Sequence, residues 1–289
     1  MNQNKDTDQY KKKLFQTFKA FISFCDSNGL EYYCCGGTAI GAVRHKGIIP
    51  WDDDVDVFMP RKDFEKLFEL KNVAEESGYS VASIKDGSNY SLFMKFYDSN
   101  TTLWEIKEIP FLSGVFIDIF PLDTTNDSKE TFLSKYHKRR QLDFFYQLSY
   151  SHYSISGILH YYKSGNKKAF KKGLMSLFVP VFMQGYFRKK LLRLDQKYAN
   201  DKGNQIISPY GDYWGKEYLD NSWFKSSVLA QFEDFEVKLP VGIHEYLTQV
   251  YGDYMKLPPK EKQVTHHYHY YVNLEKRISL EEIMQTELK

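Results

Sequence analysis

Four aspartates, Asp52, Asp53, Asp54 and Asp56, lie within the stretch GIIPWDDDVDVFM at residues 47–59. Carboxylates this close repel one another and resist simultaneous ionisation unless a positive charge holds them together. The apolar residues that follow predict a strand, and alternate side chains of a strand share a face. Asp54 and Asp56 should therefore project together. Such a pair is half of a site for Mg²⁺ or Mn²⁺, ions that bind carboxylates together with substrate phosphates.

A third carboxylate is predicted from a distant segment. Asp118 is the one charged residue in the apolar run VFIDIFP at 115–121. A charge inside such a strand is costly unless it is paired or coordinated. Asp118 is therefore the candidate third ligand beside Asp54 and Asp56, and the three carboxylates together predict a metal centre.

A glycine turn can supply backbone N–H groups that bind phosphate, which carboxylates cannot do. Gly36 and Gly37 precede Thr38, and glycine lets a backbone approach a phosphate closely, while a helix N-terminus presents free N–H groups. Arg44 and His45 follow on the same connection, where they can reach phosphate oxygens, and arginine offers a bidentate fork. The turn, the aspartates and a distant strand aspartate together predict metal-dependent phosphoryl chemistry.

Two other interpretations of the acidic stretch stay open. A DxDxD pattern can begin a calcium loop of the EF-hand kind, but that loop has Gly at its sixth place and Glu at its twelfth, where this chain has Val57 and Asp63. The more serious alternative is a solvated acidic loop that holds no ligand. Asp118 can also be a structural carboxylate satisfied by its neighbours.

The elements that must position these residues follow from apolar periodicity. Helices are predicted over 14–25, 39–44, 61–70 and 244–251, with Thr38 as the N-cap of the second. Strands are predicted over 30–35, 54–59, 91–97, 102–106 and 114–120, the last closed by Pro121. This order predicts an α/β (α+β) fold in which helices flank a small mixed sheet and the C-terminal half is largely helical.

The net charge of +2 hides an uneven distribution. Residues 131–200 contain fourteen Lys and Arg against two acidic residues, Asp143 and Asp195. A basic middle on an acidic body indicates an anionic partner, which can be nucleic acid, a membrane surface or a phosphate-rich substrate, or else a solvated helical face. Near residue 125 the sequence pattern changes to long helical segments with basic faces, but no linker marks independent domains.

The expected location is the cytoplasm. The three cysteines, Cys25, Cys34 and Cys35, form neither a disulfide framework nor a zinc spacing, and they fit a reducing compartment. The N-terminus lacks the apolar core of a secretory signal. The longest apolar run, about 177–183, is far shorter than the ~20 residues of a membrane-spanning helix.

The stretch GGTAIGAVRHKGIIPWDDDVD at 36–56, continued by MPR at 59–61, resembles the LicD family of phosphotransferases. The resemblance continues in FIDIFPLD at 116–123 and, more loosely, in the segment 240–259. It implies a nucleotidyltransferase-like fold related to the fukutins. Residues 1–125 would form the catalytic core, and 126–289 the helical, first basic and then aromatic-rich C-terminal part of the same unit.

The resemblance also implies a reaction. Phosphorylcholine transferases of this family move phosphocholine from CDP-choline to a hydroxyl of a cell-surface glycan such as teichoic acid, lipopolysaccharide or capsule, releasing CMP. Relatives use CDP-ribitol or CDP-glycerol. Carried over to this chain, Asp54, Asp56 and Asp118 are the metal ligands and catalytic residues. Asp52 contributes directly or through water, and the turn 36–38 cradles the diphosphate.

The same resemblance suggests partners. Glycan acceptors of this family are often polymeric or lipid-linked, so the basic segment 131–200 indicates peripheral membrane contact at the inner face, and no nucleic acid is expected. Two alternative functions stay open. One is a true nucleotidyltransferase that releases pyrophosphate, and the other is a nucleotide- or glycan-binding protein without turnover.

Overall fold

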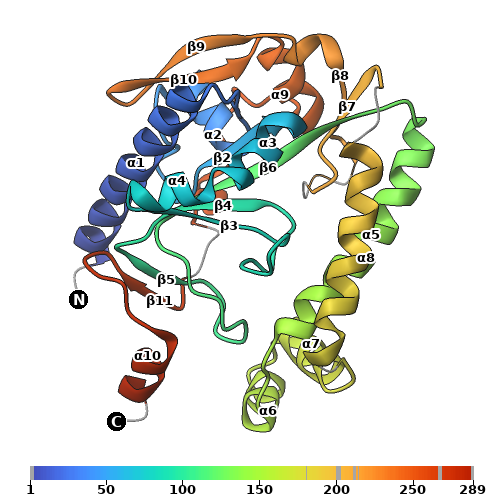
Figure 1. Cartoon of the computed structure of the whole chain (residues 1–289). Coiled ribbons are helices and arrows are strands. Elements are labelled where there is room, and N and C mark those ends of the chain that lie inside the picture. Colours follow the sequence, from blue (N-terminus) through green and yellow to red (C-terminus); the bar gives the residue numbers. More distant parts are fainter. Residues whose placement is uncertain are drawn as a thin grey trace.

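A mixed sheet forms the centre of the computed structural model, which describes residues 3–179, 181–199, 203–210, 213, 215–265 and 269–287 (Figure 1). Its strands lie in the order β1, β2, β6, β4, β3, and β7 and β8 extend it beyond the end of β6. Their bounds are β1 Tyr33–Cys34, β2 Asp56–Pro60, β3 Tyr79–Ala82, β4 Met94–Asp98, β6 Phe116–Thr125, β7 Gln205–Ile207 and β8 Tyr218–Asp220. Only β2 and β6 run parallel among these paired strands. The predicted mixed α/β (α+β) class is confirmed.

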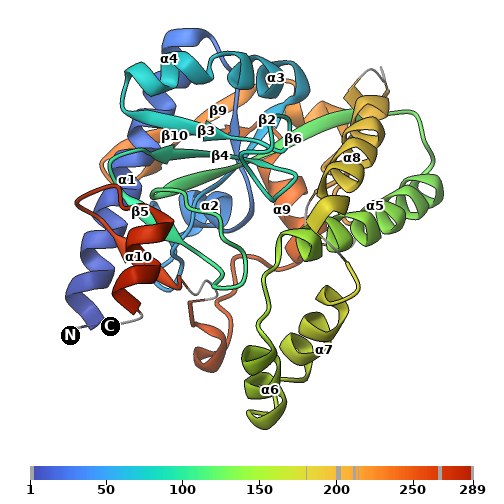
Figure 2. The same ribbon diagram turned by 60° about the horizontal axis from the view of Figure 1, so that its bottom comes forward.

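Helices surround the sheet and form an arm beside it. Near the sheet are α1 Gln3–Asn28, α2 Gly36–Ile40, which continues as a π-helical turn Gly41–His45, α3 Arg61–Glu69, α4 Lys71–Glu76 and α9 Ile243–Tyr251. The arm consists of α5 Lys129–Tyr150, α6 Ile155–Lys163, α7 Lys167–Ser176, a 3₁₀ turn Val181–Met183 and α8 Gln184–Ala199. In both views α5 and α8 lie side by side, with α6 and α7 at the end away from the sheet (Figures 1 and 2).

Smaller elements complete the fold. They are the hairpin of β9 Ser227–Phe232 and β10 Phe235–Pro240, the pair of β5 Thr102–Trp104 and β11 Tyr271–Asn273, the 3₁₀ turns Asn221–Phe224 and Lys260–Lys262, and α10 Leu280–Glu287. In the part of the chain that the structure describes, no helix combines the length and the apolar character needed to cross a bilayer.

Several predicted boundaries are wrong for identifiable reasons. The helix predicted over 39–44 begins at Gly36, and its N-cap is Cys35, whose side chain makes no capping bond. Thr38 is therefore not an N-cap. The strand predicted over 54–59 begins at Asp56, and Asp54 lies in the loop before it. Pro121 does not end β6. It lies within the strand, as the register partner of Met59, and β6 continues to Thr125.

The second half of the chain departs most from prediction. Strands β7 to β10 occupy a region for which the sequence predicted only short helices. β7 and β8 have three residues each, too few to show a pattern, whereas the alternation FEVKL in β10 was a signal that the prediction did not use. β5 forms, but it pairs with β11 instead of joining the main sheet. The helices α3 and α9 lie where the apolar spacing placed them.

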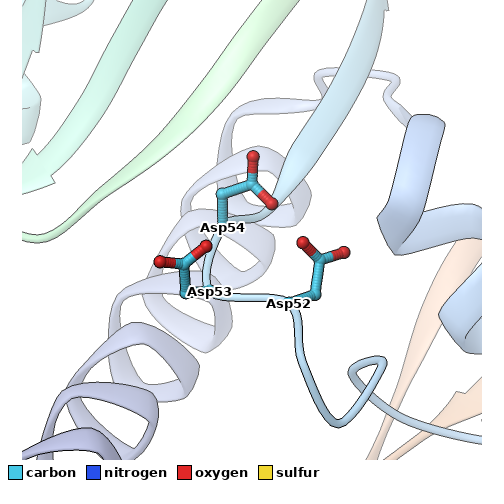
Figure 3. Close-up of side chains that lie close together, drawn as sticks. All are labelled: Asp52, Asp53 and Asp54. Atoms are coloured by element: carbon cyan, nitrogen blue, oxygen red, sulfur yellow. The ribbon is translucent and has the colours of Figure 1, made fainter. Parts of the chain in front are cut away.

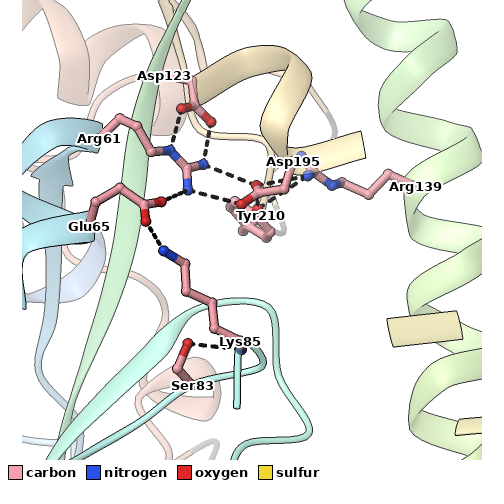
Figure 4. A network of polar contacts seen from close by, with 8 residues as sticks. All are labelled: Arg61, Glu65, Ser83, Lys85, Asp123, Arg139, Asp195 and Tyr210. Atoms are coloured by element: carbon pink, nitrogen blue, oxygen red, sulfur yellow. Dashed lines mark hydrogen bonds and ion pairs between the residues drawn. The ribbon is translucent and has the colours of Figure 1, made fainter. Parts of the chain in front are cut away.

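Buried Arg61 joins the sheet to the arm (Figure 4). Its guanidinium donates to both carboxylate oxygens of Asp123 on β6, at 2.6 and 2.7 Å. It also donates twice to Asp195 on α8, at 3.0 Å each. Arg139 on α5 donates to the same Asp195 at 3.0 Å, and Tyr210 contacts it as well. Two arginines and two aspartates thus fix α5 and α8 against the strand that carries Asp123.

Replacing Arg61 should expose the dependence of the fold on this network. Arg61→Ala leaves Asp123 buried without its partner, so we expect a loss of roughly 3–5 kcal/mol in the free energy of unfolding measured in urea. Arg193→Ala, on the exposed side of α8, should change it by less than about 0.5 kcal/mol. Equal effects of the two substitutions would show that the network does not stabilise the fold.

Candidate functional site

A cavity of about 490 Å³ lies between the sheet and α5. Its walls come from the glycine turn, the acidic loop, β2, β6, α5, the segment after β7 and α9. The residues that line it are Cys35, Gly36, Gly37, Trp51, Asp52, Asp54, Asp56, Phe58, Leu92, Phe93, Asp118, Phe120, Arg139, Arg140, Asp143, Gln147, Pro209, Tyr210, Tyr213, Glu217, Tyr246 and Tyr251. The cavity therefore brings together all four aspartates predicted to hold a metal.

Strand pairing fixes two of these carboxylates beside each other. Asp56 and Asp118 are direct partners in the parallel register of β2 and β6. The loop before β2 adds three more, and Figure 3 shows the side chains of Asp52, Asp53 and Asp54 close together on that loop. One carboxylate oxygen from each of the three lies within 4.8 Å of the others. The prediction missed Asp53, because only alternate residues of a strand share a face and this segment is not yet strand.

The charge state of Asp56 reflects this crowding. Burial, and then the charges of Asp54, Asp118 and Asp52, raise the pKa of Asp56 well above its ordinary value, while Lys95 lowers it. Several hard oxygen ligands that repel one another in a partly buried site suit a divalent cation such as Mg²⁺ or Mn²⁺. The group Asp52, Asp53 and Asp54 fits such an ion, whereas ligation by Asp56 and Asp118 stays a prediction.

Buried Lys95 is a site residue that the sequence did not predict. It lies on β4, opposite Asp118 in the antiparallel register, and its ammonium lies 2.9 Å from Asp118 and 3.2 Å from Glu105. Burial opposes its positive charge, but the two carboxylates outweigh burial and raise the pKa of Lys95. Lys95 therefore holds Asp118 in place from beneath the acidic cluster. A lysine within the predicted strand 91–97 was the available signal.

The glycine turn packs directly on the carboxylates. Gly36 has a φ of +56°, and a Cβ there would lie 3.0 Å from Asp56 Oδ2, while a Cβ on Gly37 would overlap Asp52. The Thr38 hydroxyl accepts a hydrogen bond from the Asp56 N–H at 2.9 Å. Thr38 is buried and does not line the cavity. It positions Asp56, and its predicted contact with a diphosphate stays a prediction.

Arg44 and His45 lie outside the cavity walls. Arg44 donates to the backbone carbonyls of Tyr254 at 2.6 Å and Lys256 at 3.4 Å, which ties the segment after α9 to the π-helical turn. The His45 ring packs edge-on against Trp51, which does line the cavity. Burial and then Arg44 lower the pKa of His45. Phosphate binding by these two residues stays a prediction.

Helix α5 contributes two arginines to the cavity. Arg139 and Arg140 both line the cavity, and Arg139 is 3% exposed. Arg139 also stacks on Tyr210, 4.4 Å from the ring centre. The sequence indicated that the segment 131–200 is basic, but helical periodicity alone did not tell which bases face inward. Asp143 on the same helix also lines the cavity. Arginines in one cavity with a group of carboxylates suit a phosphate bridged by a cation.

Tyrosines close the remaining side. Tyr246 on α9 accepts a hydrogen bond from the Gly36 N–H at 3.2 Å, so the C-terminal part of the chain supports the turn. The rings of Tyr213 and Tyr251 pack edge-on, with centres 4.9 Å apart. Burial raises the pKa of all three tyrosines, so they stay neutral at physiological pH. Tyr246 and Tyr251 lie in the segment 240–259 on which the looser resemblance rested.

Comparison with known proteins agrees with this geometry. The profile of the family described as LicD/FKTN/FKRP, nucleotidyltransferase domain, matches residues 29–152, the part that carries the acidic cluster. Over these residues the chain therefore matches the nucleotidyltransferase class of domain. Lipopolysaccharide cholinephosphotransferase LicD of Haemophilus influenzae is 32% identical over 254 residues, which are 86% of this chain and 90% of that protein. The chain belongs to the LicD family.

Other relatives match shorter stretches of the chain. An uncharacterized protein of Rickettsia prowazekii is 38% identical over 69 residues, 24% of this chain and 26% of that protein. Ribitol 5-phosphate transferase FKRP of Homo sapiens is 32% identical over 94 residues, 31% of this chain and 19% of that protein.

Removing one charge from the cluster should stabilise the metal-free protein. Because the pKa of Asp56 is raised in the folded state, its ionisation costs stability as the pH rises from its unfolded value through its folded value. Asp54→Asn weakens that repulsion, so we expect a melting temperature higher by about 2–4 °C at about pH 8 and little change at about pH 4. Asp8→Asn, on the exposed face of α1, is the control. Mg²⁺ should stabilise the wild type but not the Asp54 variant.

A single methyl group on the glycine turn should disturb the same site. Gly37→Ala places a Cβ where Asp52 lies, so we expect stabilisation by Mg²⁺ to need about tenfold more ion, measured by thermal shift. Gly185→Ala on α8, where nothing lies within 4 Å, should leave the response to Mg²⁺ unchanged. An unaltered response of Gly37→Ala would show that Asp52 does not take part.

Proposed function

We propose that this protein transfers a phospho-alcohol, for which we propose phosphocholine, from a CDP-activated donor to a hydroxyl of a cell-surface glycan and releases CMP. The observation that carries the proposal is one cavity lined both by Asp52, Asp54, Asp56 and Asp118 and by Arg139 and Arg140. The name of the Haemophilus relative, a lipopolysaccharide cholinephosphotransferase, supports the alcohol and the glycan acceptor. The matched nucleotidyltransferase domain supports a nucleotide-activated donor.

In this proposal Asp54, Asp56 and Asp118 hold Mg²⁺ or Mn²⁺, with Asp52 beside them. Such an ion, when bound, neutralises charge on the phosphate oxygens and lowers the pKa of a bound hydroxyl. Gly36 and Gly37 admit the diphosphate close to the first turn of α2, where N–H groups are not used within the helix.

The arginines take the opposite side of the diphosphate. Arg139 and Arg140 contribute positive charge and planar hydrogen-bond donors that orient it. Arg139 is fixed by Asp195, so its position does not depend on the substrate. Asp118 orients the acceptor hydroxyl or accepts its proton, and Lys95 fixes the carboxylate of Asp118 for either role.

Aromatic residues support choline as the alcohol. A quaternary ammonium is attracted to the faces of aromatic rings, and the cavity is lined by Trp51, Tyr210, Tyr213, Tyr246 and Tyr251. The buried free thiols of Cys25, Cys34 and Cys35 are in keeping with the reducing cytoplasm that we propose as the location. The acceptor we propose is a glycan of the lipopolysaccharide, teichoic acid or capsule type, lipid-linked in some forms.

The decisive experiment is CMP release by the purified protein. We expect metal-dependent CMP from one of CDP-choline, CDP-glycerol and CDP-ribitol when crude bacterial glycan is present. Asp54→Asn and Asp56→Asn should lower the rate by at least about 10³-fold, and Arg139→Lys by about 10- to 100-fold, since it loses the planar fork. Lys225→Gln, outside the cavity, is the matched control.

Other products would point elsewhere. Pyrophosphate released from a nucleoside triphosphate, with no CMP from any donor, would replace the transfer reaction with nucleotidyl transfer. Donor binding by calorimetry with no product, in the presence of metal and glycan, would leave a binding protein without turnover.

A further inference from the structure

The end of the arm exposes large apolar side chains in unusual number. Among the described residues, 21 large apolar side chains are exposed, and ten of them lie within residues 155–186. The turn between α7 and α8 holds four, and the first turn of α8 holds a fifth. We call these five the apolar cap: Leu177, Phe178, Val181, Phe182 and Tyr186. Phe178 and Phe182 are 83% and 85% exposed. Apolar side chains gathered on one surface mark a site of interaction.

Helix α6, which lies at the end of the arm away from the sheet (Figure 2), carries a second group of exposed apolar side chains. Ile155, Leu159 and Tyr162 are spaced by four and three residues, so they share one face of the helix. All three are exposed. α6 packs against α7, and α7 against α5, so this group and the apolar cap belong to one helical tip.

The charge around this tip selects its partner. Residues 144–194 contain nine Lys and Arg and no Asp or Glu. Lys167, Lys168 and Lys171 on α7 and Lys189 and Lys190 on α8 are exposed. Exposed aromatic and aliphatic side chains beside lysines are typical of helices that lie in a membrane interface. A second copy of the chain would bring equal positive charge against this tip, whereas anionic lipid brings the opposite charge.

We propose that the apolar cap and its lysines dock the protein on an anionic lipid surface. Phe178 and Phe182 enter the interface at the level of the headgroups, and the lysines contact lipid phosphates. From Arg140 at the cavity to Tyr150 at the end of α5 the helix rises about 15 Å. Docking here would hold the cavity near the membrane. The link to a lipid-linked acceptor rests on the proposed function, but the docking itself does not.

The test is cosedimentation with vesicles of equal parts phosphatidylglycerol and phosphatidylcholine, without donor or metal. We expect the wild type to bind and to be released by about 0.5 M NaCl. The double variant Phe178→Ser/Phe182→Ser should bind at least about tenfold more weakly than the wild type. The triple variant Lys167→Gln/Lys168→Gln/Lys171→Gln should lose about a hundredfold at low salt.

Matched controls separate this proposal from the transfer reaction. Val228→Ser/Leu229→Ser removes exposed apolar side chains from β9 and should bind vesicles like the wild type. The Phe variant should release CMP normally with a water-soluble acceptor, so a failed CMP assay would bear only on the proposed function. Docking is overturned if the Phe variant binds vesicles unchanged or phosphatidylcholine alone binds equally well. It is also overturned if the wild type is a dimer that this variant dissociates.

Discussion

Repulsion among carboxylates at one end of β2 and β6 is the constraint around which this molecule is built. Asp56 and Asp118 are register partners, so the backbone hydrogen bonds of the sheet hold them side by side whatever their charge. Buried Lys95 offsets part of the repulsion from below, and the closely packed glycine turn leaves room for the acidic loop. Folding thus gathers carboxylates that repel one another, and the divalent cation that we propose would relieve that repulsion.

Strand β6 also connects the carboxylates of the cavity to the helical arm. β6 carries Asp118 into the cavity and, five residues later, carries Asp123 to Arg61. Arg61 in turn holds Asp195, which holds Arg139. The positive wall of the cavity is therefore fixed relative to the negative wall through buried, bidentate ion pairs, not through a flexible linker. Arg61 and Asp123 lie in the segments 59–61 and 116–123 on which the family resemblance rested, although neither lines the cavity.

The sequence predicted the fold class and the four aspartates that line the cavity, because like charges beside apolar strands leave a local signal. It did not predict Lys95, which only the pairing of β4 with β6 brings to Asp118. Thr38 was assigned as a cap, whereas its hydroxyl accepts from the Asp56 N–H across the turn. Tertiary partners of this kind have no fixed spacing along the chain. β7 and β8 were missed because three residues are too few to show alternation, whereas β10 does alternate and its pattern was not used. The roles of the site residues and the division of the chain near residue 125 stay predictions.

The basic middle segment shows why a charge count underdetermines function. Its bases divide between two directions: Arg139 is buried at the cavity wall, whereas lysines 167, 168 and 171 stand exposed beside the apolar cap. Which base faces inward depends on the rotation of α5, and that rotation is set by Asp195 and the aromatic contacts of Phe145 with Phe187 on α8. In the two proposals, α5 contributes Arg139 and Arg140 to the cavity, while α7 and α8, which pack against α5, carry the surface proposed to meet lipid. Weakening the packing of α5 on α8 should therefore disturb both.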